Sequence, residues 1–108
     1  MPSWIAEQAV LWVHASGRRV EGRIGVGMPA IEPTGEAGCE LALDGLDRPV
    51  VIYGEGTLQA LLLALRLAGM RLHDFEAKGG RVLRANGDEL PLDALFGPLL
   101  RAAGQPRV

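Results

Sequence analysis

The stretch from Thr57 to Lys78 reads TLQALLLALRLAGMRLHDFEAK, and it decides the fold of this chain. Good helix formers dominate it, and Gly79-Gly80 follows at its end, where a capping glycine belongs. Gly56 or Thr57 can serve as the N-cap. A helix over these residues is about 33 Å long, enough to cross a sheet of four strands. The stretch therefore predicts one long helix laid across a sheet.

Four segments before this helix have the hydrophobic pattern of β-strands. In Arg18–Met28 apolar and charged residues alternate, which predicts a half-buried antiparallel strand. Its apolar face consists of Val20, Ile24, Val26 and Met28, and its polar face of Arg19, Glu21 and Arg23. The other strands are predicted at Trp4–Ala15, Cys39–Asp44 and Val50–Tyr53. Pro29–Gly38 contains two prolines and two glycines and is predicted as a loop.

The connections between these segments are short, which favours an antiparallel meander because parallel strands need longer crossovers. After the helix, Arg81–Arg84 is a candidate strand, Asn86-Gly87 a tight turn, and Leu90–Leu92 a candidate return strand. Asp93–Ala103 has helical spacing interrupted by Gly97-Pro98. We expect a single α+β domain over residues 1–108: an antiparallel four-stranded meander packed on one long helix, with a small C-terminal hairpin or short helix.

Composition narrows the class of protein. The chain of 108 residues has room for one core, and its net charge of −2 with no basic run argues against a dedicated nucleic-acid binder. The N-terminus does not have the pattern of a signal peptide, and no apolar run approaches the roughly 20 residues that span a bilayer. Cys39 is the lone cysteine. We expect a cytoplasmic protein, and its arginine-, alanine- and glycine-rich composition is typical of a GC-rich bacterial genome.

The long helix has two apolar faces when its residues are placed at intervals of about 100°. The broad face, predicted to lie against the sheet, contains Leu58, Leu61, Leu62, Leu65, Ala68, Gly69, Leu72 and Phe75. A second stripe of Leu63, Leu67 and Met70 lies nearly opposite, between Gln59, Arg66 and Asp74. Either the C-terminal segment covers this stripe with Leu92, Leu95, Phe96, Leu99 and Leu100, or it forms an interface. The candidate interface residues are Leu63, Leu67, Met70, Gln59 and Arg66.

Two glycine-rich segments are better explained by structure than by ligand binding. Gly25–Ala30 resembles a dinucleotide fingerprint, but prolines follow where that motif requires a helix. Gly54–Thr57 stands between a strand and a helix, where free amides can hold an anion. However, no lysine follows and Glu55 adds negative charge, so a capped chain reversal is favoured.

No set of side chains predicts catalysis, a metal or a cofactor. His14, Cys39 and His73 lie on three separate elements and lack the paired spacing of zinc ligands. Acidic residues gather around the predicted loop and turn, at Glu32, Glu36, Glu40, Asp44 and Asp47, and we interpret them as a solvated edge. Trp4 and Trp12 are eight residues apart, which predicts that they share a strand face as core or interface anchors.

The stretch Tyr53-Gly54-Glu55-Gly56-Thr57-Leu58-Gln59-Ala60-Leu61 resembles the Tyr-Gly-x-x-x-Leu-Gln-Ala-Leu strand-to-helix motif of a family of small uncharacterised bacterial proteins, a domain of unknown function. The resemblance covers Arg23–Leu83 and implies no activity, cofactor or catalytic residue. It implies at most an immunity-like protein or an accessory partner. Gln59 either hydrogen-bonds the strand–helix turn or contacts a partner.

Three functions are compatible with these patterns. The leading hypothesis is a non-enzymatic protein–protein interaction module, dimeric or bound to another protein, that uses the Leu63, Leu67 and Met70 side or an exposed strand edge. The second is a small ligand-binding protein or enzyme with a pocket between Pro29–Gly38 and the helix N-terminus. The third is a nucleic-acid-binding small β-barrel. We expect no membrane association.

Overall fold

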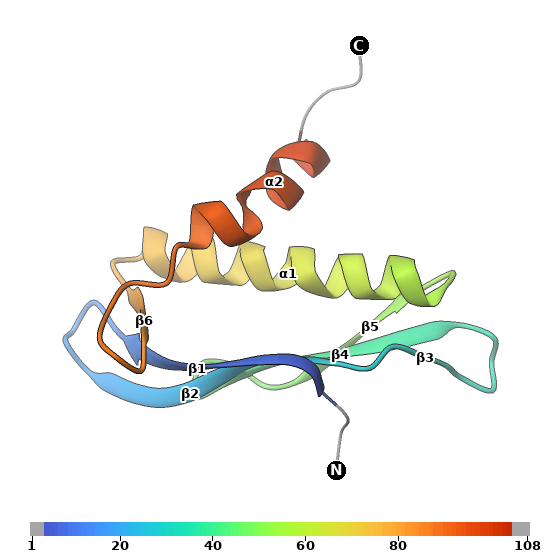
Figure 1. Cartoon of the computed structure of the whole chain (residues 1–108), viewed down its shortest axis with the longest axis horizontal. Helices are drawn as coiled ribbons and strands as arrows, with labels where there is room; N and C mark the ends of the chain where they lie inside the picture. Colours follow the sequence, from blue (N-terminus) through green and yellow to red (C-terminus); the bar gives the residue numbers. More distant parts are fainter. Residues whose placement is uncertain (1–3, 105–108) are drawn as a thin grey trace.

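The computed structural model describes residues 4–104, as a sheet with one long and one short helix (Figure 1). The strands are β1 (Trp4–Val13), β2 (Arg19–Gly27), β3 (Ala30–Ile31), β4 (Ala37–Asp44), β5 (Val50–Gly54) and β6 (Arg81–Arg84). The helices are α1 (Thr57–Ala77) and α2 (Leu92–Gly104). The α+β class, the long helix and the short C-terminal helix are therefore confirmed.

The sheet is open and antiparallel, and it has more strands than the predicted meander of four. From one edge to the other β6 pairs with β1, β1 with β2, β2 with β4, and β4 with β5. The short β3 continues alongside β4 within the segment predicted as a loop. The segment after α1 adds β6 to the edge of the main sheet. Of the predicted C-terminal hairpin, the structure shows only an isolated bridge between Leu83 and Glu89.

The two tryptophans of β1 lie on opposite faces, so the prediction that they share one was wrong. The pairing of β1 with β2 shifts register between Trp4 and Ala6, which is a β-bulge. A bulge inserts one extra residue and reverses the alternation beyond it. Trp12 is therefore fully buried in the core, whereas Trp4 lies over Gly25 on the outer face of the sheet.

Both ends of α1 are as the sequence predicts. Gly56 is the N-cap, and Lys78 is the C-cap. The amide of Gly79 donates to Glu76, and the amide of Gly80 donates to Phe75. This is the Schellman arrangement, and it requires the positive φ of 92° that Gly79 adopts.

The face of α1 against the sheet is narrower and lined by smaller residues than the pattern predicts. Ala60, Ala64, Ala68 and Leu72 are fully buried there, because small side chains let the helix approach the strands closely. Leu58 and Leu62, predicted to face the sheet, are 68% and 43% exposed. Met28, predicted on the buried face of β2, is also exposed. The alternation of β2 is otherwise confirmed, since Ile24 and Val26 are in the core.

Helix α2 folds back against α1 at Gly69, which the sequence assigned to the sheet contact. A Cβ built on Gly69 would lie 2.8 Å from the Cβ of Phe96, so the glycine lets the two helices approach closely. The helix continues through Gly97 and Pro98, which were expected to interrupt it. In Figure 1, α2 crosses α1 at an angle.

Candidate functional site

The first half of β1 is an open sheet edge. Strand β6 pairs only with Val10–Val13, so within residues 4–104 Trp4–Ala9 has a strand partner on one side only. Residues 5–9 are all exposed. The unpaired N–H and C=O groups of such an edge are a template for another strand. We call this segment the open edge.

An apolar groove lies beside the open edge, on the helical side of the sheet. Its volume is about 260 Å³, and it is lined by Ala6, Glu7, Gln8, Ile24, Val26, Leu65, Leu90, Leu95 and Phe96. One wall belongs to the strands and the other to α1 and α2. Leu95 stands at its rim with 53% of its surface exposed. Open edge and groove together form the candidate site.

The leading hypothesis named an exposed strand edge as one possible interaction surface, but the sequence did not indicate which strand. The residues of β1 were recognised only as part of a predicted strand, and Leu95 and Phe96 only as a possible cover for the second stripe of the long helix. One signal was available: Arg81–Arg84 is four residues long, whereas the predicted first strand is about three times that length. A four-residue neighbour leaves most of such an edge open.

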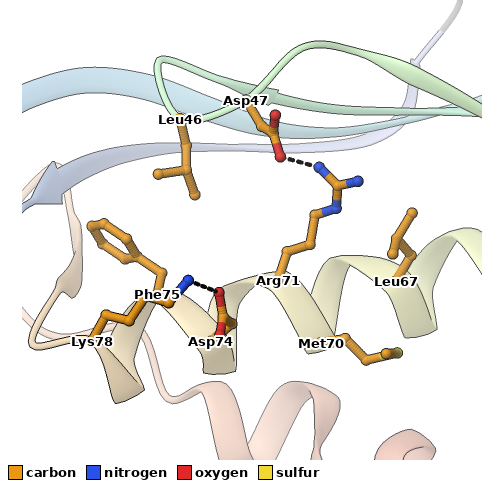
Figure 2. Close-up of a pocket in the computed structure, with 8 residues that line it drawn as sticks. All are labelled: Leu46, Asp47, Leu67, Met70, Arg71, Asp74, Phe75 and Lys78. Atoms are coloured by element: carbon orange, nitrogen blue, oxygen red, sulfur yellow. Dashed lines mark hydrogen bonds and ion pairs between the residues drawn. The ribbon is translucent and has the colours of Figure 1, made fainter.

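A second cleft lies on the other flank of α1, below the β4–β5 turn (Figure 2). Its volume is about 680 Å³, and Leu46, Leu67 and Phe75 form its apolar part. Its charged groups neutralise one another, because Arg71 pairs with Asp47 and Lys78 with Asp74. The cleft therefore offers no uncompensated charge to a ligand.

The candidate interface residues of α1 lie around this second flank. Leu63 and Leu67 are half-buried, and Leu67 packs against the core. Met70 is 49% exposed and points away from the β4–β5 turn in Figure 2. Gln59 and Arg66 are exposed. The C-terminal helix contacts α1 at Gly69, about 100° around the helix from Met70, so this contact lies outside the stripe.

Gln59 makes the hydrogen bond that the first of its two predicted roles requires. Its Oε1 accepts from the amide of Glu55 at 2.6 Å, which closes the turn between β5 and α1. The hollow beside it is shallow and lined by Glu36, Tyr53, Gly54, Glu55 and Gln59. A pocket near the helix N-terminus therefore exists. However, the side-chain oxygen of Gln59 already accepts a hydrogen bond, and the carboxylates of Glu36 and Glu55 border the pocket.

The histidines and the cysteine each have separate contacts. His14 stands edge-on to Phe75 at 5.3 Å between ring centroids, and Nε2 of His73 lies 3.6 Å from a carboxylate oxygen of Asp93. Cys39 is in the core, where its thiol donates to the carbonyl of Gly27, and burial raises its pKa. Within the described residues, no three His, Cys, Asp or Glu side chains gather as metal ligands.

An ion-pair cluster crosses the outer face of the sheet. Arg23 on β2 pairs with Glu7 on β1 at 3.1 Å and with Asp44 on β4 at 2.7 Å. Its guanidinium also lies 5.1 Å from the ring of Trp4, a cation–π distance. The hydrogen bond to Asp44 is the main cause of the raised pKa of Arg23. One guanidinium thus connects three strands by pairing with two carboxylates.

The strands of residues 4–104 form an open sheet and not the barrel of the third hypothesis: β5 lies at one edge, and β6 with the first half of β1 lies at the other. Among residues 4–104, no helix is both long and apolar enough to cross a bilayer. No protein family model, no curated protein and no solved structure matches this chain.

Proposed function

We propose that this protein is a non-enzymatic interaction module that binds an extended strand of another polypeptide at the open edge of β1. The strand adds to the sheet and places every second side chain in the apolar groove. The partner segment is therefore a peptide with apolar residues at alternate positions, in keeping with the alternation of side chains along a strand.

The observation that carries this proposal is the position of the groove directly beside the open edge. In strand addition the backbone hydrogen bonds supply affinity, and pockets for alternate side chains supply specificity. Ala6 and Gln8 line the groove and belong to the open edge, so an added strand lies next to the same cavity. Leu65, Leu95 and Phe96 give it an apolar wall.

Selection from a displayed library of random ten-residue peptides tests this function. The protein is immobilised at low density, so that copies do not contact each other. We expect enrichment of peptides with alternating apolar residues, and we expect Ala6→Lys to abolish their binding because it places a charge at the groove. Met70→Lys, at a comparably exposed site on the other flank, is the control and should bind normally. Enriched peptides that bind the Ala6→Lys protein equally well would contradict the proposal.

A further inference from the structure

We infer that the peptide strand bound at the open edge carries a carboxylate at the end nearest to β6. This inference rests on the proposed function and names the chemistry of the partner. The carboxylate binds in a pocket that begins where the open edge ends. The volume of this pocket is about 670 Å³, and three arginines line it: Arg19 on β2, and Arg81 and Arg84 on β6. We call it the arginine pocket.

The arginine pocket adjoins the open edge. Ala9 is the last residue of the open edge, and it also lines the pocket, as do residues 85–87 of the turn after β6. Strand β6 ends at Arg84, which pairs with Val10. An added strand beside the open edge therefore lies in line with β6, and its end meets this turn. The pocket thus borders the terminal residues of a bound strand.

The arginine pocket holds positive charge that its own carboxylates do not match. Within residues 4–104, the side chains of Arg19 and Arg84 have no ion-pair partner, and Arg81 pairs through Nε with Glu89 at 2.9 Å. Glu21 is the one carboxylate among the lining residues. The cleft of Figure 2 differs, because both of its cations are paired with acids. Charge complementarity therefore favours an anionic group in the arginine pocket.

Strand register places two of the arginines on one face of the sheet. Arg19 and Arg81 both pair with Val13, from opposite sides of β1, and directly paired residues share a face. Leu11 and Leu83 add apolar lining. Planar guanidinium groups bind carboxylates through two parallel hydrogen bonds. Since the proposed ligand is a polypeptide, the matching group is the carboxylate of an aspartate, of a glutamate or of the chain end.

The direction of the added strand decides which of its ends carries the carboxylate. Strand β6 runs antiparallel to β1 and ends beside the open edge. A peptide antiparallel to β1 runs in the same direction as β6, so its N-terminal end meets the arginine pocket. A peptide parallel to β1 presents its C-terminal end instead. A chain-end carboxylate therefore requires parallel addition, whereas an acidic side chain is compatible with either direction.

Binding of four synthetic peptides tests the inference. Each has a core of three valine–threonine repeats, which supplies apolar side chains at alternate positions. Three of them are acetylated and amidated: one has two glutamates before the core and two glutamines after it, one has the reverse, and one has glutamines at both ends. The fourth has the glutamine sequence with a free C-terminal carboxylate. Amide chemical shifts of the isotopically labelled protein measure the dissociation constants and locate the bound peptide.

We expect one glutamate peptide, and not the other, to bind about three- to tenfold more tightly than the amidated glutamine peptide. The gain is modest because exposed ion pairs contribute little, and it should shrink in about 500 mM salt. If the gain belongs to the C-terminal glutamates, tighter binding of the free-carboxylate peptide identifies the chain end as a sufficient source, and equal binding identifies the side chain. Either source supports the inference.

Arginine variants show where the carboxylate binds. Arg19→Gln and Arg84→Gln should each reduce the gain and leave the affinity for the glutamine peptide unchanged. Arg48→Gln is the matched control, because Arg48 is also exposed and lies in the β4–β5 turn, away from the open edge. It changes the net charge by the same amount, so it should leave the gain intact.

The outcomes separate the two proposals. If the glutamine peptide shifts the amides of the open edge but no carboxylate improves binding, the inference is wrong and the proposed function stands. Equal gains from glutamates at both ends, or a gain that Arg48→Gln reduces as much as Arg84→Gln does, also contradict the inference. Such a gain would come from overall charge. If none of the four peptides binds, both proposals fail.

Discussion

The indole Nε1–H of Trp12 donates a hydrogen bond of 2.7 Å to the backbone carbonyl of Asp44. The donor is on β1 and the acceptor is at the end of β4, with β2 between them. The indole crosses β2 at Gly22, where a Cβ would collide with both the indole and the carbonyl. One side chain thus connects two strands that do not pair with each other, and a glycine makes the crossing possible.

Removal of this donor should destabilise the protein. In Trp12→Phe the carbonyl of Asp44 loses its side-chain partner and the core loses volume, so the free energy of unfolding should fall by about 2–4 kcal/mol. Urea denaturation followed by far-ultraviolet circular dichroism measures it. A loss below about 0.5 kcal/mol would show that water replaces the indole without cost.

Substitution of Gly22 should be costly for a different reason. Gly22→Ala forces the Cβ against the crossing indole, and overpacking of this kind costs about 1–3 kcal/mol. Gly56→Ala is the comparison: nothing lies within 4 Å of its added Cβ, so it loses only the preference for glycine at the N-cap, which costs less than about 1 kcal/mol. If both variants unfold at the same urea concentration, the crossing tolerates a methyl group and the interpretation of Gly22 is wrong.

Gln59 should contribute to stability at the start of α1. Gln59→Ala removes the acceptor for the Glu55 amide and should lower the free energy of unfolding by about 0.5–1.5 kcal/mol. Gln59→Glu keeps an acceptor oxygen and should recover part of the loss. Equal stability of wild type and Gln59→Ala would indicate that solvent satisfies the amide.

Gly69→Ala should not stabilise the protein, although a glycine-to-alanine change in a helix ordinarily does. In an exposed helix interior the change would stabilise by about 1 kcal/mol. Here the new Cβ would meet Phe96, so we expect no stabilisation and faster amide hydrogen exchange in α2. A more stable variant with unchanged protection of α2 would contradict this account of the helix contact.

Cys39 should make stability depend on alkaline pH. Burial raises the pKa of its thiol in the folded chain above the unfolded value, which is about 8.5. Below that pH both states hold the proton and the contribution is complete. As the pH rises through the folded-state pKa, the unfolded chain has already released its proton, so stability declines. Urea midpoints above pH 8.5 should fall more steeply for wild type than for Cys39→Ala.

The helices and strands of this fold could be predicted more reliably than the way in which they pair and pack. Periodicity and capping residues define α1 almost to the residue, because both act through local backbone geometry. Neither reveals that Arg81–Arg84 joins β1, since strand pairing is a long-range choice. The burial of Ala60 and the exposure of Leu58 were also missed, because hydrophobicity does not encode how closely a helix approaches a sheet.

The candidate site could not be located from the sequence, because it also depends on long-range strand pairing. The open edge exists because β6 ends where β1 continues, which depends on the lengths of two strands far apart in the sequence. The bulge at Ile5 could not be seen either, because Trp4 and Trp12 have the spacing of residues on one face. By contrast, the hydrogen bond of Gln59 to the strand–helix turn was one of its two predicted roles, since its partner is four residues away.

The bulge in β1 has a consequence for spectroscopy. It places one tryptophan in the core and the other on the outer face, at the open edge itself. The chain therefore carries two intrinsic fluorophores in unlike surroundings. Trp4→Phe leaves an emission that follows the core, and Trp12→Phe leaves one that follows the edge strand. The fluorescence of these two single-tryptophan variants can thus distinguish unfolding of the core from an event at the open edge.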